Sequence, residues 1–381
     1  MSLLGTHKKF LYAVGVLVGA MVGVGIFGMP YAFSKSGFWF GMGFLVLICL
    51  STLMVDLMYG EVVLRTHEQH QMLGYTKRYL GSTFSKVVFF TSVLTGYVGL
   101  LAYIIISGDF LTTLLSPFFY TPMETYSIVF GVVLSLIVLR GLKTVSWLEL
   151  SFSGLFIAVV ALIFAAGFRA IDPAHFHGFD HGYLSLPYGV ILFAFAGIVA
   201  IPMQREVLRG EEGKMPKAIV TAVLIAAGLY ALFTTTVVGI SGTATTPDAI
   251  SGLYGFLGST ITTLGAVFGI LAVMTSFMML ASGMIEIFNF DFGIKRFNSW
   301  LLVIVPPMLL FLAGIRTFVD VVSLAGGVSI GLEQVLIVFL YARAKSQGNR
   351  VPEYSLNIPT WLLYLVMFIL SSGVVYFIFI R

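Results

Sequence analysis

Two stretches of the sequence place glycine and proline inside long apolar runs, and both have the composition of a binding site built from backbone. They are residues 19–30, GAMVGVGIFGMP, and residues 193–202, FAFAGIVAIP. Glycine and proline favour a break in a membrane helix, and lipid cannot satisfy the amide and carbonyl groups that a break frees. Such backbone is tolerated where it lines a cavity, so paired breaks predict a transporter's binding site. The alternative is a simple kink or a packing face of small residues.

The freed backbone groups suit the two ends of a zwitterion. A half-helix that begins after a break offers free N–H groups and the positive end of its dipole to a carboxylate. Gly23, Val24 and Gly25 fit this role, because glycine lets a ligand approach the backbone closely. A half-helix that ends before a break offers carbonyls to an ammonium group or a cation, and residues 194–197 supply a similar set. A zwitterion could therefore bind without a charged side chain.

Three carboxylates lie inside apolar segments, where an ionisable side chain is a functional candidate. We expect Asp56, Glu149 and Glu333 to be buried, while Glu61, Glu286 and Asp320 lie nearer to segment ends. A buried carboxylate without a partner could carry a proton. It could equally form a gate ion pair or a satisfied structural group near the interface, and both alternatives stay open.

A group of histidines lies in one loop and raises the question of a metal site. His175, His177 and His181 occur there with Asp172 and Asp180. Their spacing matches no standard zinc site, and loop histidines at a membrane surface are usually solvated. We therefore expect no metal site in this loop.

The composition is that of a polytopic membrane protein. Of 381 residues, 59% are hydrophobic and 10% are charged, with a mean hydropathy of +1.01. Soluble domains carry about 25% charged residues. The net charge of +4 comes from lysine and arginine in short loops and does not indicate nucleic-acid binding. The single cysteine excludes an internal disulfide framework, and the long, glycine-broken first apolar run is unlike a cleavable signal peptide.

The apolar segments predict about eleven transmembrane helices in one domain, at roughly 20 residues per span. The expected spans are residues 9–33, 38–63, 85–114, 124–140, 145–168, 185–206, 216–240, 260–288, 299–316, 318–343 and 358–380. Residues 69–80 and 248–257 are expected to form short helices outside the spans. The spans divide into repeat one (residues 9–168), repeat two (residues 185–343) and one extra helix (residues 358–380).

Lysine and arginine in alternate loops predict the orientation. Cations occur at Lys8 and Lys9 and in loops such as 207–217 and 343–357, whereas loops 115–123 and 241–259 have none. The N-terminus is therefore expected in the cytoplasm and, after an odd number of spans, the C-terminus outside. Spans 1 and 6 then enter the membrane from opposite sides, which makes the two repeats inverted.

At this point the sequence resembles a known group of transporters. The segments that carry the resemblance are GVGIFGMPYAF at residues 23–33, FAFAG at residues 193–197 with Pro202 and Glu206, and AVMTSF at residues 272–277. They resemble amino-acid transporters of the amino acid–polyamine–organocation superfamily. The chain looks closest to the branch of amino acid/auxin permeases and aromatic amino acid permeases. The resemblance implies an all-α integral membrane fold with the LeuT-type five-plus-five inverted repeat and broken helices 1 and 6.

The resemblance also implies a set of substrate contacts around the breaks, with an aromatic lid from span 6 and a tyrosine from span 3. For the aromatic members, the alternative is an ordinary core or lipid-facing position, because phenylalanine is abundant in this chain. The implied substrate-binding residues are Met21, Gly23, Val24 and Gly25; Tyr97 and Tyr103; Phe193, Ala194, Phe195, Ala196 and Gly197; and Leu280.

Sodium-coupled relatives hold a cation between spans 1 and 8, and the resemblance implies the same here. The oxygens would come from the carbonyls of Gly19, Val22 and Ala272 and the hydroxyls of Thr275 and Ser276. The spacing of the last three places them on one helical face. Alternatively, the two hydroxyls bond back to their own helix. Some relatives replace the cation with a span-5 lysine, which residues 145–168 lack; this favours sodium without excluding a carboxylate proton carrier.

We therefore expect a secondary active transporter of neutral or aromatic amino acids that works by alternating access with sodium, in the cell membrane and without a cofactor. A proton-coupled symporter or an exchanger of the same fold is the alternative. A transporter-like nutrient sensor or a channel is more distant, because the loops are short and the spans show no polar stripe. An enzyme is not expected. The expected partners are the amino acid and the lipid bilayer, with no nucleic acid, in a monomer or weak oligomer.

Overall fold

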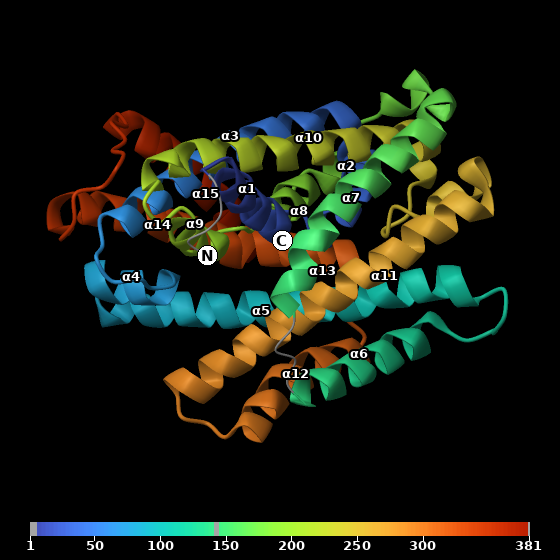
Figure 1. Ribbon diagram of the computed structural model, residues 1–381. Coiled ribbons are helices and arrows are strands. Elements are labelled where there is room, and N and C mark those ends of the chain that lie inside the picture. The colour runs from blue at the N-terminus through green and yellow to red at the C-terminus, as the bar shows by residue number, and fades with distance from the viewer. Residues whose placement is uncertain (1–5, 141–144, 380–381) are drawn as a thin grey trace.

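The computed structural model describes residues 6–140 and 145–379, which form helices and no strand (Figure 1). The α-helices are α1 Thr6–Met21, α2 Gly25–Ser36, α3 Phe38–Leu64, α4 Met72–Tyr79, α5 Ser82–Leu115, α6 Met123–Arg140, α7 Val145–Gly167, α8 Leu186–Ala194, α9 Ala200–Val207, α10 Met215–Ser241, α11 Tyr254–Glu286, α12 Arg296–Leu312, α13 Phe318–Leu324, α14 Gly331–Gln347 and α15 Thr360–Phe379. Short 3-10 turns are η1 Phe168–Ala170, η2 Pro173–Phe176, η3 His181–Tyr183, η4 Glu212–Lys214, η5 Gly242–Ala244 and η6 Ser251–Leu253, and π-helical turns are η7 Ile287–Asp291 and η8 Ala325–Ile330.

The helices have the length and composition of membrane spans. Within the described residues, seven are long and apolar enough to cross a bilayer, or eight if the bent pair α1–α2 counts as one span. This confirms an all-helical, multi-pass membrane protein. The count is three below the predicted eleven. Helices α8 and α9 are each short, α12 has only 17 residues, and only Phe156–Ala170 of the α7 region counts, as a shorter apolar helix. The eleven-span, inverted-repeat topology stays a prediction.

The helices pack in layers around α5 and α11, which cross each other at the centre (Figure 1). On one side lie α3, α10 and α14, and on the other lie α6 and α12. Glycines allow the close approach of α5 and α11: Gly99 of α5 faces Leu280 of α11, and Gly269 of α11 faces Phe110 of α5. Small residues at such crossings are the usual basis of helix packing in membranes.

Both predicted breaks are present. Helix α1 ends at Met21 and α2 begins at Gly25 after a bend of 55°. Helix α8 ends at Ala194 and α9 begins at Ala200, leaving residues 195–199 non-helical. The expected helix near residues 69–80 is also present as α4. Residues 251–257, formed by η6 and the first residues of α11, are a short helical segment in the region expected for the second one, and Gly258, with a φ of 76°, separates it from the rest of α11.

The sequence did not predict the irregular turn in the segment read as span 10. Between α13 and α14, η8 is π-helical and contains Gly326 and Gly327. A side chain at Gly326 would collide with the carbonyl of Gly189, so these glycines bring η8 against the backbone of α8. A π-turn is uncommon inside a helix and often marks a functional site. Here it adjoins the half-helix that leads into the second break.

Candidate substrate site at the helix breaks

The two helix breaks lie in direct contact. A Cβ atom added at Gly25 would lie 2.7 Å from the Cα of Ala194 and 2.9 Å from its Cβ. The first residue of α2 therefore touches the last residue of α8. In addition, α1 packs along α9 and α2 packs along α8, so the half-helix before each break lies beside the half-helix after the other break. Two stretches that are about 170 residues apart in sequence thus form one structural unit, as their paired occurrence predicts.

Free amide groups lie at the start of both second half-helices. The amides of Ile26 and Phe27 bond to the carbonyls of Gly23 and Val24, but no described hydrogen bond uses the amides of Val24 and Gly25. The second break repeats this pattern. There the amides of Ala200 and Ile201 are bonded, and those of Ile198 and Val199 are in no described bond. Each helix start therefore keeps two N–H donors and a positive dipole end, which suit an anionic group.

The carbonyl ends of the two first half-helices meet at one side chain that the sequence did not single out. The hydroxyl of Tyr230 in α10 lies 2.8 Å from the carbonyl oxygen of Met21 and 2.6 Å from that of Ala194. Tyr230 is 0% exposed, and its ring packs edge-on against that of Phe195 at 5.1 Å. One buried hydroxyl thus joins the ends of α1 and α8. No sequence pattern distinguishes this residue among the 17 tyrosines of the chain.

The predicted side chains at the breaks are packed together. Gly197 faces Met21 and Leu17, because a Cβ there would lie 2.7 Å from Cγ of Met21 and 2.9 Å from Cδ1 of Leu17. By contrast, a Cβ at Gly23 would meet nothing within 4 Å. The space beside Gly23 is therefore open, whereas the space beside Gly197 is filled by flexible aliphatic side chains that a ligand would have to displace.

Sequence comparison gives the family of this membrane protein. Residues 6–378 match the tryptophan/tyrosine permease family. The chain belongs to this family. It is also similar to the tryptophan-specific transport protein of Shigella flexneri, with 23% identity over 378 residues that cover 92% of this chain and 90% of the relative.

Membership of a permease family confirms the predicted class of function. The chain is a multi-pass membrane protein of amino-acid transport rather than an enzyme. The expected resemblance to amino-acid permeases is confirmed at this level. Its assignment to the LeuT-type branch stays a prediction, as do the individual substrate and ion contacts.

The two tyrosines predicted to contact the substrate from span 3, Tyr97 and Tyr103, lie in α5. Tyr97 donates its hydroxyl to the carbonyl of Leu302 in α12, 2.9 Å away, which turns it toward α12 rather than toward the breaks. Tyr103 is partly buried and packs against the core. Leu280 lies opposite Gly99 at the α5–α11 crossing. Of the predicted contacts outside the breaks, the structure therefore brings none into a described contact with Gly25 or Ala194.

A cluster of phenylalanines surrounds the start of α2, and the sequence did not single it out either. The ring of Phe27 lies 5.0 Å from Phe110 of α5, 6.1 Å from Phe156 of α7 and 6.0 Å from Phe233 of α10. All four side chains are buried. The cluster packs one face of the first break against three other helices.

One of the residues predicted to bind sodium, Thr275, already forms hydrogen bonds within its own helix. Thr275 is buried and donates its hydroxyl to its own helix, 2.9 Å from the carbonyl of Ala272 and 3.3 Å from that of Leu271. This is the back-bonded alternative considered from the sequence. Among the described residues, the main neighbours of α11 are α5, α6, α7 and α12, and α1 is not one of them. The carbonyls of Gly19 and Val22 therefore lie on a helix that is not a principal partner of α11.

The predicted acidic residues have three different environments. Asp56 in α3 is 0% exposed, and both of its carboxylate oxygens have no hydrogen-bond partner among the described residues. Glu333 in α14 accepts hydrogen bonds from Thr91 at 3.0 Å and Ser92 at 2.9 Å, both on α5. Glu149 lies in α7, outside the residues whose side chains are described. Only Asp56 is thus a described buried carboxylate without a partner.

The surroundings of Asp56 are polar but contain no described positive partner. Gln334 of α14 donates to Thr52, one turn before Asp56, at 3.3 Å, while its own carbonyl oxygen has no described partner. The hydroxyl of Tyr59 also lacks a described partner. The α3–α14 interface therefore holds several buried oxygen atoms without a described partner, and a proton, an ion or water could satisfy them.

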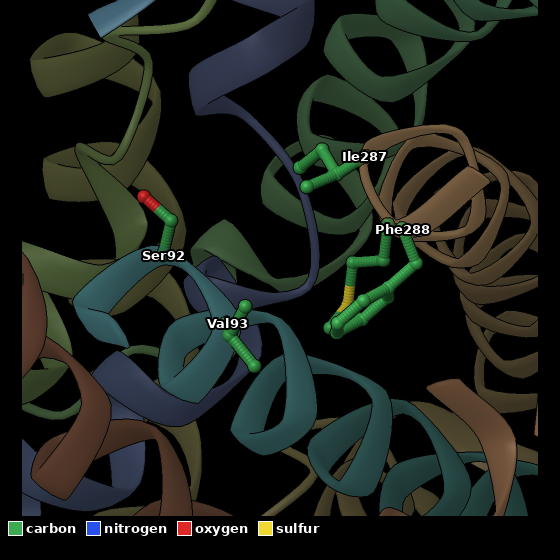
Figure 2. A pocket seen from close by; sticks show the side chains of 5 residues that line it. Ser92, Val93, Ile287 and Phe288 are labelled. Atoms are coloured by element: carbon green, nitrogen blue, oxygen red, sulfur yellow. The ribbon is translucent and has the colours of Figure 1, made fainter. Parts of the chain in front are cut away.

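A small pocket lies near Glu333, between α5 and the end of α11 (Figure 2). It is lined by Ser92, Val93, Met284, Ile287 and Phe288 and has a volume of about 10 Å³, which is room for about one water molecule. Pockets that hold drug-sized ligands span about 300–1,000 Å³. This pocket is therefore too small for an aromatic amino acid, and the helix breaks remain the stronger candidate for the substrate site.

The remaining ionisable side chains sit at the helix ends. Glu61, at the end of α3, accepts from Arg65 at 2.7 Å and from the amide of Leu356 at 2.6 Å, which fastens the segment after α14 to α3. Of the loop histidines, His175 has a structural contact, because its ring lies 2.8 Å from the carbonyl of Gly239. No cluster of three metal-ligating side chains occurs in the described residues, including this loop.

Proposed function

We propose that this permease is a secondary active transporter of aromatic amino acids, with tryptophan and tyrosine as its substrates. The observation that carries the proposal is the contact between the two helix breaks, where two free amide pairs and two carbonyl ends converge. The family and the tryptophan-specific relative supply the substrate class. The amides of Val24 and Gly25 would receive the carboxylate, and the carbonyl ends of α1 and α8 would receive the ammonium group.

The ring of the substrate would occupy the space beside Gly23. An alanine-sized side chain there meets no atom within 4 Å, and neighbouring Ala196 and Gly197 are small. The side chains of Met21 and Leu17 could move aside, because long aliphatic side chains change rotamer readily. The predicted contacts of Phe193 and Phe195 belong to this proposal as the aromatic walls of the site.

The topology that we propose is eleven spans in a LeuT-type inverted repeat, with the N-terminus cytoplasmic and the C-terminus outside. The crossed pairing of α1 with α9 and of α2 with α8 supports it, because an inverted repeat places the first half-helix of one repeat on the same side of the membrane as the second half-helix of the other. Alternating access would move the spans that contain α1–α2, α3, α8–α9 and α10 against α5, α6, α11 and α12. Hydrogen bonds from Arg205 of α9 to the carbonyls of Val63 and Thr66, at 2.9 Å and 2.8 Å, tie members of the first group together.

Proton coupling through Asp56 is the coupling that the geometry supports best. A charged carboxylate buried without a partner costs several kcal/mol, so the side chain is expected to be neutral in this conformation. A group that is neutral when buried and charged when exposed to water can carry one proton per transport cycle. Glu333, which accepts two hydroxyl hydrogen bonds, is the second buried carboxylate that could carry the proton.

Sodium coupling is the second candidate. It is favoured by the burial of Ala272 and Thr275 on one face of α11, with Ser276 partly buried beside them. The Thr275 hydroxyl donates its proton to its own helix and keeps its oxygen lone pairs for a cation. In this case, Gly19 and Val22 would supply carbonyls after a movement of α1 toward α11.

A competition assay tests the proposed substrate class. Uptake of labelled tryptophan into cells that express the permease should fall by more than half with a tenfold excess of unlabelled tryptophan or tyrosine. The reason is that these amino acids share the zwitterionic head and fit the open side of Gly23. Lysine and glutamate in the same excess should leave uptake within about 20%, because the break offers no opposing side-chain charge. Equal competition by lysine or glutamate would exclude an aromatic-selective site.

A further inference from the structure

The hydroxyl of Tyr230 contacts both helix breaks. It lies within hydrogen-bond distance of the last carbonyl of α1 and the last carbonyl of α8. Both carbonyls belong to helix C-termini, which carry the negative end of the helix dipole. Two such ends repel each other when buried, and a donor placed between them removes part of that repulsion. Tyr230 therefore helps to set the distance between the two breaks.

The hydroxyl has one proton for two acceptors. It can donate fully to the carbonyl of Met21 or to that of Ala194, and the other carbonyl then faces the hydroxyl oxygen at short range. No other described hydrogen bond reaches the carbonyl of Ala194, while that of Met21 also accepts from the amide of Gly23 at 2.9 Å. An acceptor at the end of a buried helix with only a shared donor is suited to a further donor, such as an ammonium group.

The next turn of α10 carries a second polar group without a partner. Thr234 is 0% exposed, and its hydroxyl has no hydrogen-bond partner among the described residues. Residues four positions apart lie on the same helix face, so Thr234 shares the face of Tyr230. A threonine hydroxyl inside a membrane helix usually bonds back to its own helix, as Thr275 does. The Thr234 hydroxyl, which has no described hydrogen-bond partner, independently supports a ligand beside this face of α10.

We propose that Tyr230 is a positioning residue for the substrate's ammonium group. In the empty site its hydroxyl holds the carbonyl ends of α1 and α8 together. When the substrate binds, the ammonium group takes over one carbonyl and the hydroxyl keeps the other, so that the two breaks stay at the spacing that the zwitterion needs. This role rests on the proposed function, and it adds a residue from α10 to a site otherwise made from α1–α2 and α8–α9.

The test compares Tyr230→Phe with Tyr188→Phe. Tyr188 of α8 is also a buried tyrosine whose hydroxyl reaches two backbone carbonyls, those of Ile369 at 3.2 Å and Leu370 at 2.8 Å, but these lie on α15. Both variants lose the same hydroxyl and keep the ring. Tyr230→Phe should raise the KM for tryptophan uptake about tenfold with maximal uptake within about twofold, whereas Tyr188→Phe should stay within about twofold on both.

An analogue without the amino group separates positioning from general damage. Indole-3-propionate keeps the ring and the carboxylate, so its inhibition constant against tryptophan uptake should be the same in wild type and Tyr230→Phe. An equal loss of affinity for tryptophan and for indole-3-propionate would overturn the proposal, as would an unchanged KM in Tyr230→Phe. Absence of tryptophan uptake by the wild type would instead overturn the proposed function and, with it, this role.

A second variant covers the case in which Tyr230→Phe does not reach the membrane. Para-aminophenylalanine in place of Tyr230 offers one N–H to each carbonyl. It should give a folded permease with a KM within about threefold of wild type, because both carbonyls keep a donor. A folded variant of this kind with a KM raised about tenfold would contradict the positioning role.

Discussion

Replacement of Gly25 by alanine is expected to reduce tryptophan uptake at least tenfold. The added Cβ would lie 2.7 Å from the Cα of Ala194 and 3.1 Å from its amide nitrogen, so the obstacle is backbone rather than a flexible side chain. The two breaks would have to move apart. Overpacking of a buried contact costs about 1–3 kcal/mol, and here the displaced atoms are those that would hold the substrate. Both stability and transport should therefore fall.

Gly228→Ala is the matched control for this change. Gly228 lies in α10, is exposed on the helix surface, and would place its new Cβ within 4 Å of no other atom. Initial uptake rates at equal membrane expression, together with the melting temperature in detergent, should separate the two variants. Wild-type uptake by Gly25→Ala would show that the breaks need not touch during transport.

The second large effect is expected for Asp56→Asn. Asparagine mimics the neutral carboxyl in shape and polarity but cannot release a proton. The variant should therefore lose accumulation of tryptophan driven by a proton gradient by at least tenfold, while exchange of internal for external tryptophan remains within about threefold. Exchange requires only that the transporter with bound tryptophan changes between its outward and inward states. Accumulation also requires that Asp56 releases its proton on the inner side of the membrane.

Glu124→Gln serves as the control for removal of a carboxylate. Glu124 lies at the start of α6, is 40% exposed and pairs with Arg316 at the surface, so its loss should change neither measurement by more than about twofold. Accumulation by Asp56→Asn at the wild-type level would exclude Asp56 as the proton carrier. An equal loss of exchange and accumulation would indicate a structural role instead.

The sequence was informative wherever the cause of a structural feature is local. Gly23, Gly25 and Pro30 limit helix formation through their own covalent geometry, so the first break could be predicted from residue types alone. The second break follows from Gly197 and Pro202 in the same way. That the breaks meet, through Gly25 and Ala194, followed from their paired occurrence in a membrane chain.

Rotations of apolar helices were not predictable. Helix α5 is apolar on nearly all sides, so its sequence carries no amphipathic signal that would orient Tyr97. The hydroxyl of Tyr97 instead finds the carbonyl of Leu302, a contact set by packing between distant segments. Tyr230 escaped notice for the same reason, because its partners lie 209 and 36 residues away in the chain.

Two further features depend on backbone contacts that residue types do not specify. The π-helical turn η8 reads as ordinary apolar helix in sequence, and only the approach of Gly326 to Gly189 shows why it is irregular. The lack of a partner at Asp56 is likewise a property of the packed α3–α14 interface. From the sequence, Asp56, Glu149 and Glu333 were all candidates, and Glu333 rather than Asp56 stood out among them.

The most direct test of the account is accumulation of labelled tryptophan by the purified permease in proteoliposomes with an imposed inward proton gradient. Proton coupling through Asp56 predicts a transient internal concentration several times the external one, abolished when a protonophore collapses the gradient. An inward sodium gradient at equal pH on both sides should give only equilibration. Accumulation with sodium alone, and none with protons, would contradict proton coupling through Asp56 and favour the site of Gly19, Val22, Ala272, Thr275 and Ser276.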